Sequence, residues 1–539
     1  MATEGRRAPV IDAEGRSEPP GPVLARSWPS VVAGVTAIGI VVALAWDVGG
    51  YFAPGYLGAG VIAFAVLGAL LVLRPPHWSF STQALVALGA LATLVVWTAL
   101  SSRWSPAPDT ALEETQRTLV YVGLFALALI AAGSGRLARF LVLGVAAAVM
   151  VVVGAGLLSR LYPDVLGAPA SLVSIGGYRL AYPLNYWNAY GALASLATVL
   201  TVGIASDPRS AVPIRAIAAG AAVIAAVAMY LSFSRGAWLA LIVGVVALLA
   251  LGAHRGSLLV TGGIVGLASA LAVGRLDTYP ALTDNPRLDG GQLEAGHAYA
   301  PQLLTIVGIV LVVQALLAAG RASPAVMKLV DAVTRPVVRG TAIGLGVAFV
   351  AIYAVGAAKV EGRTAAWTED ATSWVDRQWA EFLRPGTFAA QDNTARLTTA
   401  RGTRSDLYRV AIDGFEHRPL WGDGAGGFEV RFMRARRVDE TVRNAHSLYL
   451  ETLGQLGLVG ALLLLAFIAS IVAAAIRSRV RPGGLGRSQT AAVGGACAVW
   501  IAHSMVDWDW QMPALTGAAL ILAATLFPYG RRSSERGPE

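Results

Sequence analysis

Residues 212–253 read VPIRAIAAGAAVIAAVAMYLSFSRGAWLALIVGVVALLALGA, and this stretch decides the fold. Two apolar runs, 212–233 and 236–253, are separated only by Ser234 and Arg235. Each run is close to the length that crosses a hydrocarbon core of about 30 Å as a helix. Arg235 then lies in a turn at a membrane surface, with almost no aqueous loop around it. The stretch predicts a pair of membrane-spanning helices.

The composition of the 539-residue chain extends this prediction to most of its length. Hydrophobic residues make up 55% and charged residues 14%, whereas globular domains carry about a quarter charged residues. The net charge of +9 does not indicate a nucleic-acid partner, because basic residues in such chains lie in cytoplasmic loops beside anionic membrane lipids. The single cysteine, Cys497, excludes an intrachain disulfide and a cysteine-based metal site.

We expect an all-α fold, a polytopic transmembrane helix bundle of about 12–14 helices with a large, partly helical outer loop. Fourteen apolar runs support this expectation, at 29–46, 56–73, 83–101, 118–133, 138–159, 187–206, 212–233, 236–253, 257–274, 301–320, 338–358, 454–476, 489–506 and 511–529.

The loops between these runs alternate in charge. One set is basic and includes Arg136, Arg209, Arg255 and Arg477, whereas the other set is acidic or nearly neutral and includes Asp47. Basic loops stay in the cytoplasm, which predicts a multi-pass protein of the cytoplasmic (inner) membrane with both termini cytoplasmic.

The same reasoning divides the chain into five segments. We expect a disordered cytoplasmic tail (1–27), a first transmembrane part of about 11 helices (28–358), a large extracytoplasmic loop (359–446), a last transmembrane part of about 3 helices (447–530) and a cytoplasmic tail (531–539). Within the loop, 367–382 reads as a short amphipathic helix with aromatic side chains for the membrane surface.

Arginines are the first candidates for chemistry. The guanidinium of Arg235 suits a phosphate or diphosphate at the membrane surface, although an interfacial anchor is an equal alternative. In the large loop, Arg404 and Arg409 precede a Pro-led, Gly-rich turn that contains Gly422 and Gly424. The glycines fit G-x-G-x-x-G, but no strand precedes them, so we expect a turn that approaches another segment or a sugar phosphate closely rather than a dinucleotide site.

His446 is the second kind of candidate. It lies where the large loop re-enters the membrane, and its ordinary pKa near 6.5 suits a general base acting on a hydroxyl. The alternative for a single histidine is a hydrogen-bonded interfacial residue. The one D-x-D sequence, Asp507-Trp508-Asp509, reads as an ordinary loop between the last spans.

These motifs resemble those of the O-antigen ligase and O-antigen polymerase superfamily. His446-Ser447, nine residues and then Gly457-x-x-Gly460 match one family motif in full, and Arg235-x-x-x-Leu239 matches a second. The Pro-Asn segment that contains Asn185 and Asn188 is similar to a third. The resemblance covers about residues 170–470, and His503-Ser504 lacks the glycine that would repeat the first motif.

The resemblance implies a C-type glycosyltransferase that takes a glycan from a polyprenyl diphosphate carrier and joins it to an acceptor hydroxyl, on the outer face and without metal or cofactor. His446 would be the base, and Arg235 and Arg404 would bind the diphosphate. The implied substrate-binding residues are Arg401, Arg409, Asn185, Asn188, Gly422, Gly424 and Ser447. The acceptor could be a glycan, a lipid or a protein, for a ligase or a polymerase of cell-surface polysaccharide.

Two alternatives stay open at this point. A transporter or flippase of lipid-linked sugars would bind the diphosphate and break no bond, and broken helices paired between two halves would support it. A transferase that uses a polyprenyl monophosphate sugar would need a carboxylate base in the first outer loop, where Asp47 lies.

Overall fold

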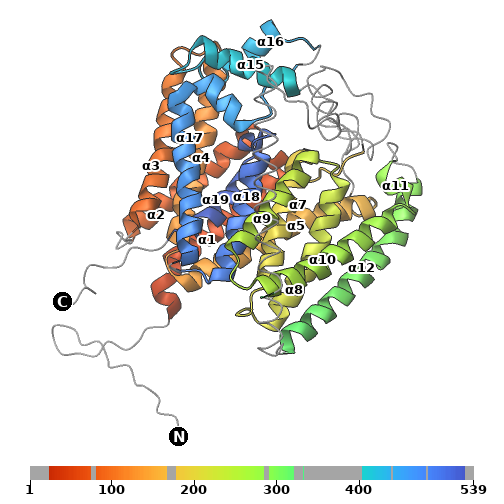
Figure 1. Ribbon diagram of the computed structural model, residues 1–539. Coiled ribbons are helices and arrows are strands. Elements are labelled where there is room, and N and C mark those ends of the chain that lie inside the picture. Colours follow the sequence, from red (N-terminus) through yellow and green to blue (C-terminus); the bar gives the residue numbers. More distant parts are fainter. Residues whose placement is uncertain are drawn as a thin grey trace, which may run out of the picture.

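The computed structural model describes residues 23–73, 80–166, 178–284, 290–320, 332, 404–438, 441–480 and 484–527, and the expected all-α fold is confirmed (Figure 1). Ten helices are long and apolar enough to cross a membrane. They are α1 (Val23–Trp46, with its candidate span at Ser27–Trp46), α2 (Ala53–Leu73), α3 (Thr82–Ser101), α4 (Pro108–Ala131), α5 (Gly135–Leu161), α7 (Trp187–Ala205), α8 (Val212–Leu231), α10 (Arg255–Leu276), α12 (Gly290–Ala319) and α17 (Leu448–Val480).

Shorter helices complete the described part. Three of them lie in the bundle: the apolar helices α9 (Arg235–Leu251) and α19 (Pro513–Ala524), and α18 (Arg487–His503). The others are α11 (Pro280–Thr283), α15 (Arg404–His417), α16 (Gly427–Ala435) and the 3-10 turns η1 (Val48–Gly50) and η4 (Asp509–Gln511).

Every predicted apolar run within the described residues forms a helix. The run 338–358, the predicted helix 367–382, Arg401 and most of the two predicted tails lie outside the described residues. Residues 23–27 of the predicted N-terminal tail belong to α1. Some helices extend beyond the apolar run. α4 begins at Pro108, ten residues before the run, and its first turns carry Glu113 and Glu114. A helix continues past the apolar boundary because hydrogen bonding along its axis does not require apolar side chains.

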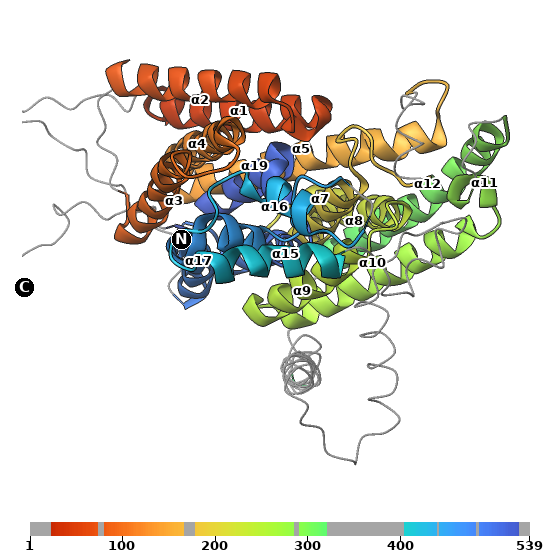
Figure 2. The ribbon, with the colours of Figure 1, turned by 90° about the horizontal axis from the view of Figure 1, so that it is seen from above.

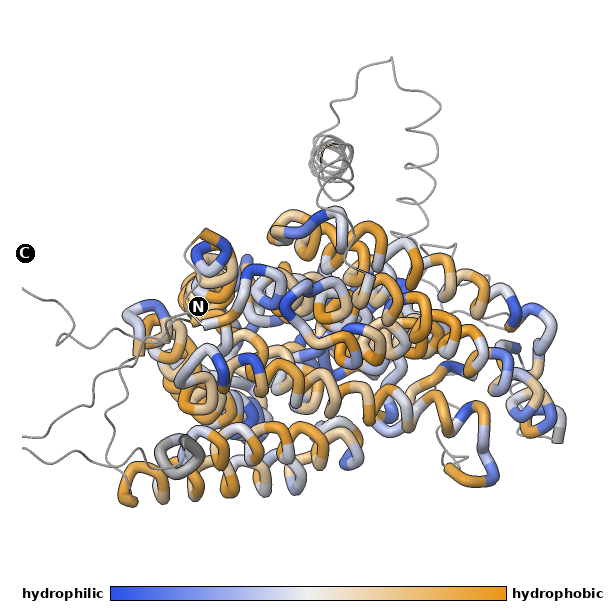
Figure 3. Tube along the Cα trace, turned by 90° about the horizontal axis from the view of Figure 1, so that it is seen from below, coloured by the Kyte–Doolittle hydropathy of each residue, from blue (hydrophilic) through white to orange (hydrophobic). Residues whose placement is uncertain are grey.

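Small residues bring the central helices together. α7, α9 and α18 pack against one another, and a side-chain carbon on Gly244 of α9 would meet the carbonyl oxygen of Gly495 in α18 at 3.1 Å. Such close backbone approach is typical of helix packing in lipid, where dispersion between small residues replaces the hydrophobic effect. The peripheral helices instead expose apolar side chains, such as Val61, Leu267 and Leu316, and apolar colour runs along them in Figure 3.

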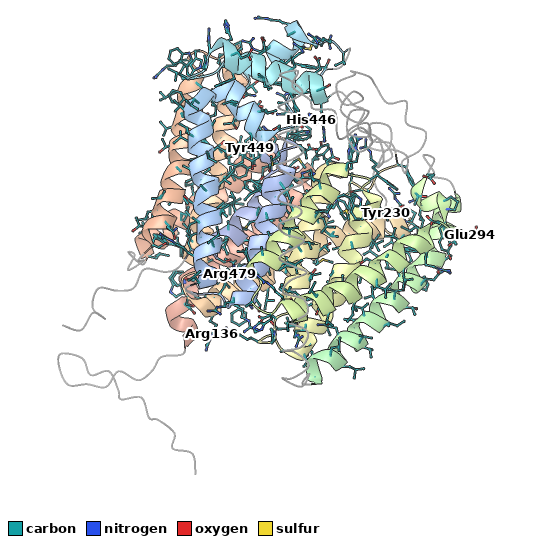
Figure 4. All side chains as sticks on the ribbon, viewed as in Figure 1. Arg136, Tyr230, Glu294, His446, Tyr449 and Arg479 are labelled. Atoms are coloured by element: carbon teal, nitrogen blue, oxygen red, sulfur yellow. The ribbon has the colours of Figure 1, made fainter. Side chains whose placement is uncertain are left out.

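The two ends of the bundle differ in charge. Arg136 and Arg479 lie at one end, whereas His446 lies at the other (Figure 4). The loops at the basic end contact one another, since Arg139 donates to the carbonyl of Arg209 at 3.3 Å and Gly135 approaches Gly484. We call these ends the basic end and the His446 end. Loops that the sequence assigned to one side of a membrane therefore lie together.

Helices α15 and α16 lie across the His446 end, over the bundle rather than within it (Figures 1 and 2). Leu407, Val410 and Ala411 of α15 form a separate small core with Phe428 and Phe432 of α16. Both helices also contact α17. The described part of the predicted outer loop is therefore partly helical and covers the His446 end of the bundle.

Helix α17 is broken at Gly457, whose φ is 62° and ψ −162°. The break frees backbone groups that pair with the segment 419–424: Leu458 N–H donates to the Pro419 carbonyl at 2.8 Å, and Gly424 N–H donates to the Gln455 carbonyl at 2.7 Å. The glycine-rich turn is thereby fixed to a membrane helix at the point where that helix bends.

Candidate active site

Asp507 is the centre of a polar cluster at the His446 end. Its side chain is fully buried, and it accepts hydrogen bonds from Arg404 Nη2 at 2.9 Å, Asn188 Nδ2 at 2.7 Å and the Tyr186 hydroxyl at 2.6 Å. These partners come from α15, from the start of α7 and from the loop before it. We call α15 and α16 together the cap. The cluster therefore joins the cap to two separate parts of the bundle.

The charges of Arg404 and Asp507 support each other. Burial alone would raise the pKa of Asp507, but the guanidinium of Arg404 outweighs burial, so the pKa lies below its ordinary range. Burial would likewise lower the pKa of Arg404, and the carboxylate reverses that effect. Asp507 is therefore ionised and holds a cationic Arg404.

His446 faces this cluster across an aromatic ring. The indole of Trp508 stacks on Tyr186 with ring centroids 4.3 Å apart, and the imidazole of His446 meets the same indole edge-on at 6.3 Å. Trp508 follows Asp507 directly in the sequence. The ring thus fixes the relative position of the imidazole and of the carboxylate that holds Arg404.

The imidazole of His446 is arranged as a base. Its Nδ1 lies 3.2 Å from the carbonyl oxygen of Asn444, an acceptor that requires a proton on Nδ1 and leaves Nε2 unprotonated when the ring is neutral. Burial lowers the pKa of His446 from 6.5, against the opposing effect of Asp507. The ring is therefore neutral near pH 7 and able to accept a proton at Nε2.

Arg235, the second predicted arginine, begins α9 at the same end of the bundle. Its side chain is exposed, and Ser234 caps the helix by accepting from Ala237 N–H at 3.3 Å. The next residue, Gly236, packs against His503 and Val506, just before Asp507. The turn thus lies beside the segment that carries the cluster.

The two predicted asparagines differ. Asn188 joins the cluster through Asp507 and through Tyr186, whose hydroxyl it approaches at 2.9 Å. Asn185 lies in the left-handed backbone region with φ 60°, and its buried Oδ1 accepts no hydrogen bond from the described residues. Asn188 is thus part of the cluster, whereas Asn185 contributes a buried side-chain acceptor, Oδ1, that no described donor satisfies.

Two other predicted binding residues, Arg409 and Ser447, have partners within the protein. Arg409 donates to Asp406 at 2.7 Å and to the Ala435 carbonyl at 2.6 Å, which ties α15 to the end of α16. Ser447 is buried and caps α17 through Leu450 N–H at 3.4 Å. These contacts explain both residues without a ligand.

Gly422 and Gly424 likewise serve close backbone approach. A side-chain carbon would come within 2.4 Å of Gln455 at Gly422 and within 2.5 Å of Ser105 at Gly424. Both glycines have positive φ, 67° and 92°. Of the two expectations for this turn, approach to another protein segment is the one that the structure supports.

Sequence reasoning missed Asp507, Tyr186 and Trp508. The interpretation of 507–509 as an ordinary loop was wrong, because Asp507 and Asp509 are both fully buried and both paired, the latter with His503 at 2.8 Å. Tyr186 stands between the two asparagines of the Pro-Asn segment, so its position was available. The only signal for the aspartates was two carboxylates near membrane depth, where an unpaired charge is expensive.

Residues 300–465 match the family model described as O-antigen ligase. The predicted resemblance to the O-antigen ligase and polymerase superfamily is confirmed for this part of the chain. The O-antigen ligase match covers about a third of the chain and includes Arg404 and His446, whereas Arg235 and Asp507 lie outside it. No curated protein matches the chain.

The match and the helices together support a multi-pass membrane protein with an O-antigen ligase-like or polymerase-like function. Proteins of this kind handle a lipid-linked glycan donor and an acceptor at a membrane, which implies that membrane lipids surround the described bundle.

Proposed function

We propose that the chain is a glycosyltransferase that moves a glycan from a polyprenyl diphosphate carrier to an acceptor hydroxyl, on the outer face of the cytoplasmic membrane. The observation that carries the proposal is that a neutral imidazole, His446, and a cation held by Asp507, Arg404, lie at the same end of the bundle. A proton acceptor and an anion-binding group are the two functions that this transfer requires.

The proposed reaction is a single displacement at the anomeric carbon. Nε2 of His446 takes the proton from the acceptor hydroxyl, whose oxygen then forms a bond to the anomeric carbon. The bond from that carbon to the diphosphate oxygen breaks, and its electron pair leaves with the polyprenyl diphosphate. Arg404 and Arg235 stabilise the negative charge that grows on the diphosphate, and the arginines, rather than a metal ion, supply the positive charge.

In this proposal, Asp507 fixes the orientation of the Arg404 guanidinium. The carboxylate accepts a hydrogen bond from Nη2 of Arg404 at 2.9 Å, and the guanidinium has further N–H donors in the same plane. A diphosphate oxygen can accept from these donors while Asp507 keeps the plane fixed. Donor binding then requires no rearrangement of the arginine, which favours catalysis by preorganised charge.

The orientation is proposed from charge. The basic loops at the end opposite His446, around Arg136, Arg209 and Arg479, would face the cytoplasm, together with both termini. The His446 end would then meet the outer leaflet, where a polyprenyl carrier presents its glycan after translocation.

The test uses the purified protein with a polyprenyl diphosphate oligosaccharide and a panel of glycan, lipid and protein acceptors, in the presence of a chelator. Wild-type protein should form transferred or elongated glycan, and the accepted members of the panel would identify a ligase or a polymerase. His446→Ala should reduce the rate by about a hundredfold or more. Donor binding without turnover on every acceptor would favour a transporter of lipid-linked sugars instead.

A further inference from the structure

One buried carboxylate, that of Glu451 in the first turn of α17, holds the loop that carries His446. Its Oε2 accepts from Ala445 N–H at 2.7 Å, and its Oε1 accepts from Asn444 Nδ2 at 3.2 Å. Oε1 also accepts from Gln511 Nε2 at 3.0 Å. The residue is 7% exposed. Three neutral donors thus satisfy this carboxylate, and two of them come from the residues just before His446.

The loop needs this support because its backbone is strained. His446 has φ 52°, in the left-handed region that is unfavourable for a residue with a side chain. Such conformations persist only where the surroundings fix them. Asn444 makes the link direct, because its side chain bonds Glu451 and its carbonyl oxygen faces Nδ1 of His446 at 3.2 Å. A shift of Asn444 would turn the imidazole.

The same carboxylate reaches the second half of the site. Gln511 is the last residue of η4, in the segment that starts at Asp507 and Trp508. Asp507 holds Arg404, and Trp508 contacts the His446 ring. Glu451 is therefore a common partner of the loop with the base and of the segment that holds the diphosphate-binding arginine.

The surroundings of Glu451 are polar and supply hydrogen-bond donors. It lines a small polar cavity with Glu114, Arg117 and Gln455, where Glu114 is paired with Arg117 at 2.5 Å. Both oxygens of Glu451 already accept from donors. A carboxylate in this state holds its three donors in place.

We propose that Glu451 is a positioning residue that sets the relative placement of His446 and Arg404. The proposal rests on the proposed function, since it assigns a role in the same reaction. Hydrogen bonding, rather than negative charge as such, is the property that matters. An amide at this position can keep its oxygen on Ala445 N–H and donate its NH₂ group to Asn444 and Gln511, whose own amides can turn to offer oxygen.

The experiment compares Glu451→Gln and Glu451→Ala in the transfer assay. Glu451→Ala should lower kcat about tenfold to a hundredfold while the KM for the donor stays within about twofold, because the loop loses its placement and Arg404 keeps Asp507. Glu451→Gln should retain activity within about threefold of wild type. Equal loss in both variants would overturn the proposal and indicate a role for the charge itself.

A matched control lies one turn along the same helix. Gln455 is 7% exposed, lines the same cavity and accepts from Gly426 N–H at 2.8 Å, but it does not contact the His446 loop in the described hydrogen bonds. Gln455→Ala should keep kcat within about threefold even if it lowers thermal stability as much as Glu451→Ala. An equal fall of kcat in Gln455→Ala would reduce Glu451 to a general structural residue and would contradict the proposal.

A readout without turnover separates the two proposals. Diethyl pyrocarbonate modification of His446, followed by peptide mass spectrometry, should be faster in Glu451→Ala than in wild type and unchanged in Glu451→Gln. Wild-type protein that transfers no glycan, with this difference intact, would overturn only the proposed function. Active wild-type protein with no difference in modification and an unaltered kcat in Glu451→Ala would overturn only the role of Glu451.

Discussion

At the scale of single residues, the candidate site depends on one ion pair, in which the aspartate is buried and the arginine is partly exposed. Arg404 and Asp507 are 2.9 Å apart, and the aspartate side chain has no exposure to solvent. Removing the arginine would leave the buried carboxylate without a counter-charge, and loss of a partner from a buried ion pair costs about 3–5 kcal/mol. Tyr186 and Asn188 add two donors to the same carboxylate. Stability and function therefore share the same group.

Asp507→Asn should lower both the thermal stability and the rate. We expect a loss of up to about 3 kcal/mol in the free energy of unfolding, since Arg404 loses its counter-charge and is only partly screened by water at 27% exposure. The double variant Asp507→Asn with Arg404→Gln should recover part of the stability and none of the activity. Additive effects on the melting temperature, in a double-mutant cycle, would contradict direct coupling.

The pH dependence follows from His446. Because burial holds its pKa below 6.5, the neutral base predominates at pH 7, and kcat/KM should fall only as pH drops below about 6.5. Asp507 favours the protonated imidazole, so Asp507→Asn should move this acid limb to lower pH in its residual activity. A rate that instead rises toward acid pH would assign His446 the role of an acid.

At the scale of elements, the break in α17 organises the His446 end. The helix interrupts itself at Gly457, and the freed backbone pairs with 419–424. A side-chain carbon at Gly457 would lie 2.4 Å from the Leu420 carbonyl carbon. This glycine of the predicted Gly-x-x-Gly motif thus serves to bring two segments into backbone contact.

Gly457→Ala should lower the melting temperature by several degrees, because the new methyl group meets backbone that cannot move and the residue has φ 62°. Gly266→Ala in α10 is the control, since nothing lies within 4 Å of its new carbon. Comparable melting temperatures for both variants, measured in the same detergent, would show that the close approach at Gly457 is not required.

The elements also show what the sequence could predict. Apolar runs located the helices, because crossing a membrane needs length and hydrophobicity that any window of sequence reveals. The same window cannot reveal which polar residues meet in space. Asp507 lies 103 positions from Arg404 and 319 from Asn188, so their pairing depends on how α7, α15 and α18 pack. The candidates His446 and Arg404 were found through a motif, whereas Asp507 and Glu451 required the structure.

At the scale of the whole molecule, the short basic loops and the candidate site lie at opposite ends. Arg136 and Arg479 mark the basic end, and His446 and the α15–α16 cap mark the other (Figure 4). The described helices between them present apolar side chains outward. The positive-inside rule counts the short basic loops and not the long arginine-rich segment of α15 and α16, so this arrangement supports the proposed orientation.

Cysteine labelling tests this orientation. In a Cys497→Ala background, Met433→Cys in α16 and Arg479→Cys in α17 replace residues with exposed side chains. A membrane-impermeant maleimide should label position 433 in intact cells and position 479 only after the membrane is permeabilised. The opposite pattern would place the site on the cytoplasmic side and would contradict transfer from a translocated carrier.

The most direct measurement separates donor binding from turnover in two variants of the same site. With a radiolabelled polyprenyl diphosphate oligosaccharide, His446→Ala should bind the donor with a Kd close to that of wild type and form no product in a single turnover. Arg404→Ala should weaken donor binding by about tenfold or more, since it removes a charge-assisted contact to the diphosphate. Product formed by His446→Ala at the wild-type rate, or unchanged donor affinity in Arg404→Ala, would contradict the assignment of base and diphosphate-binding group.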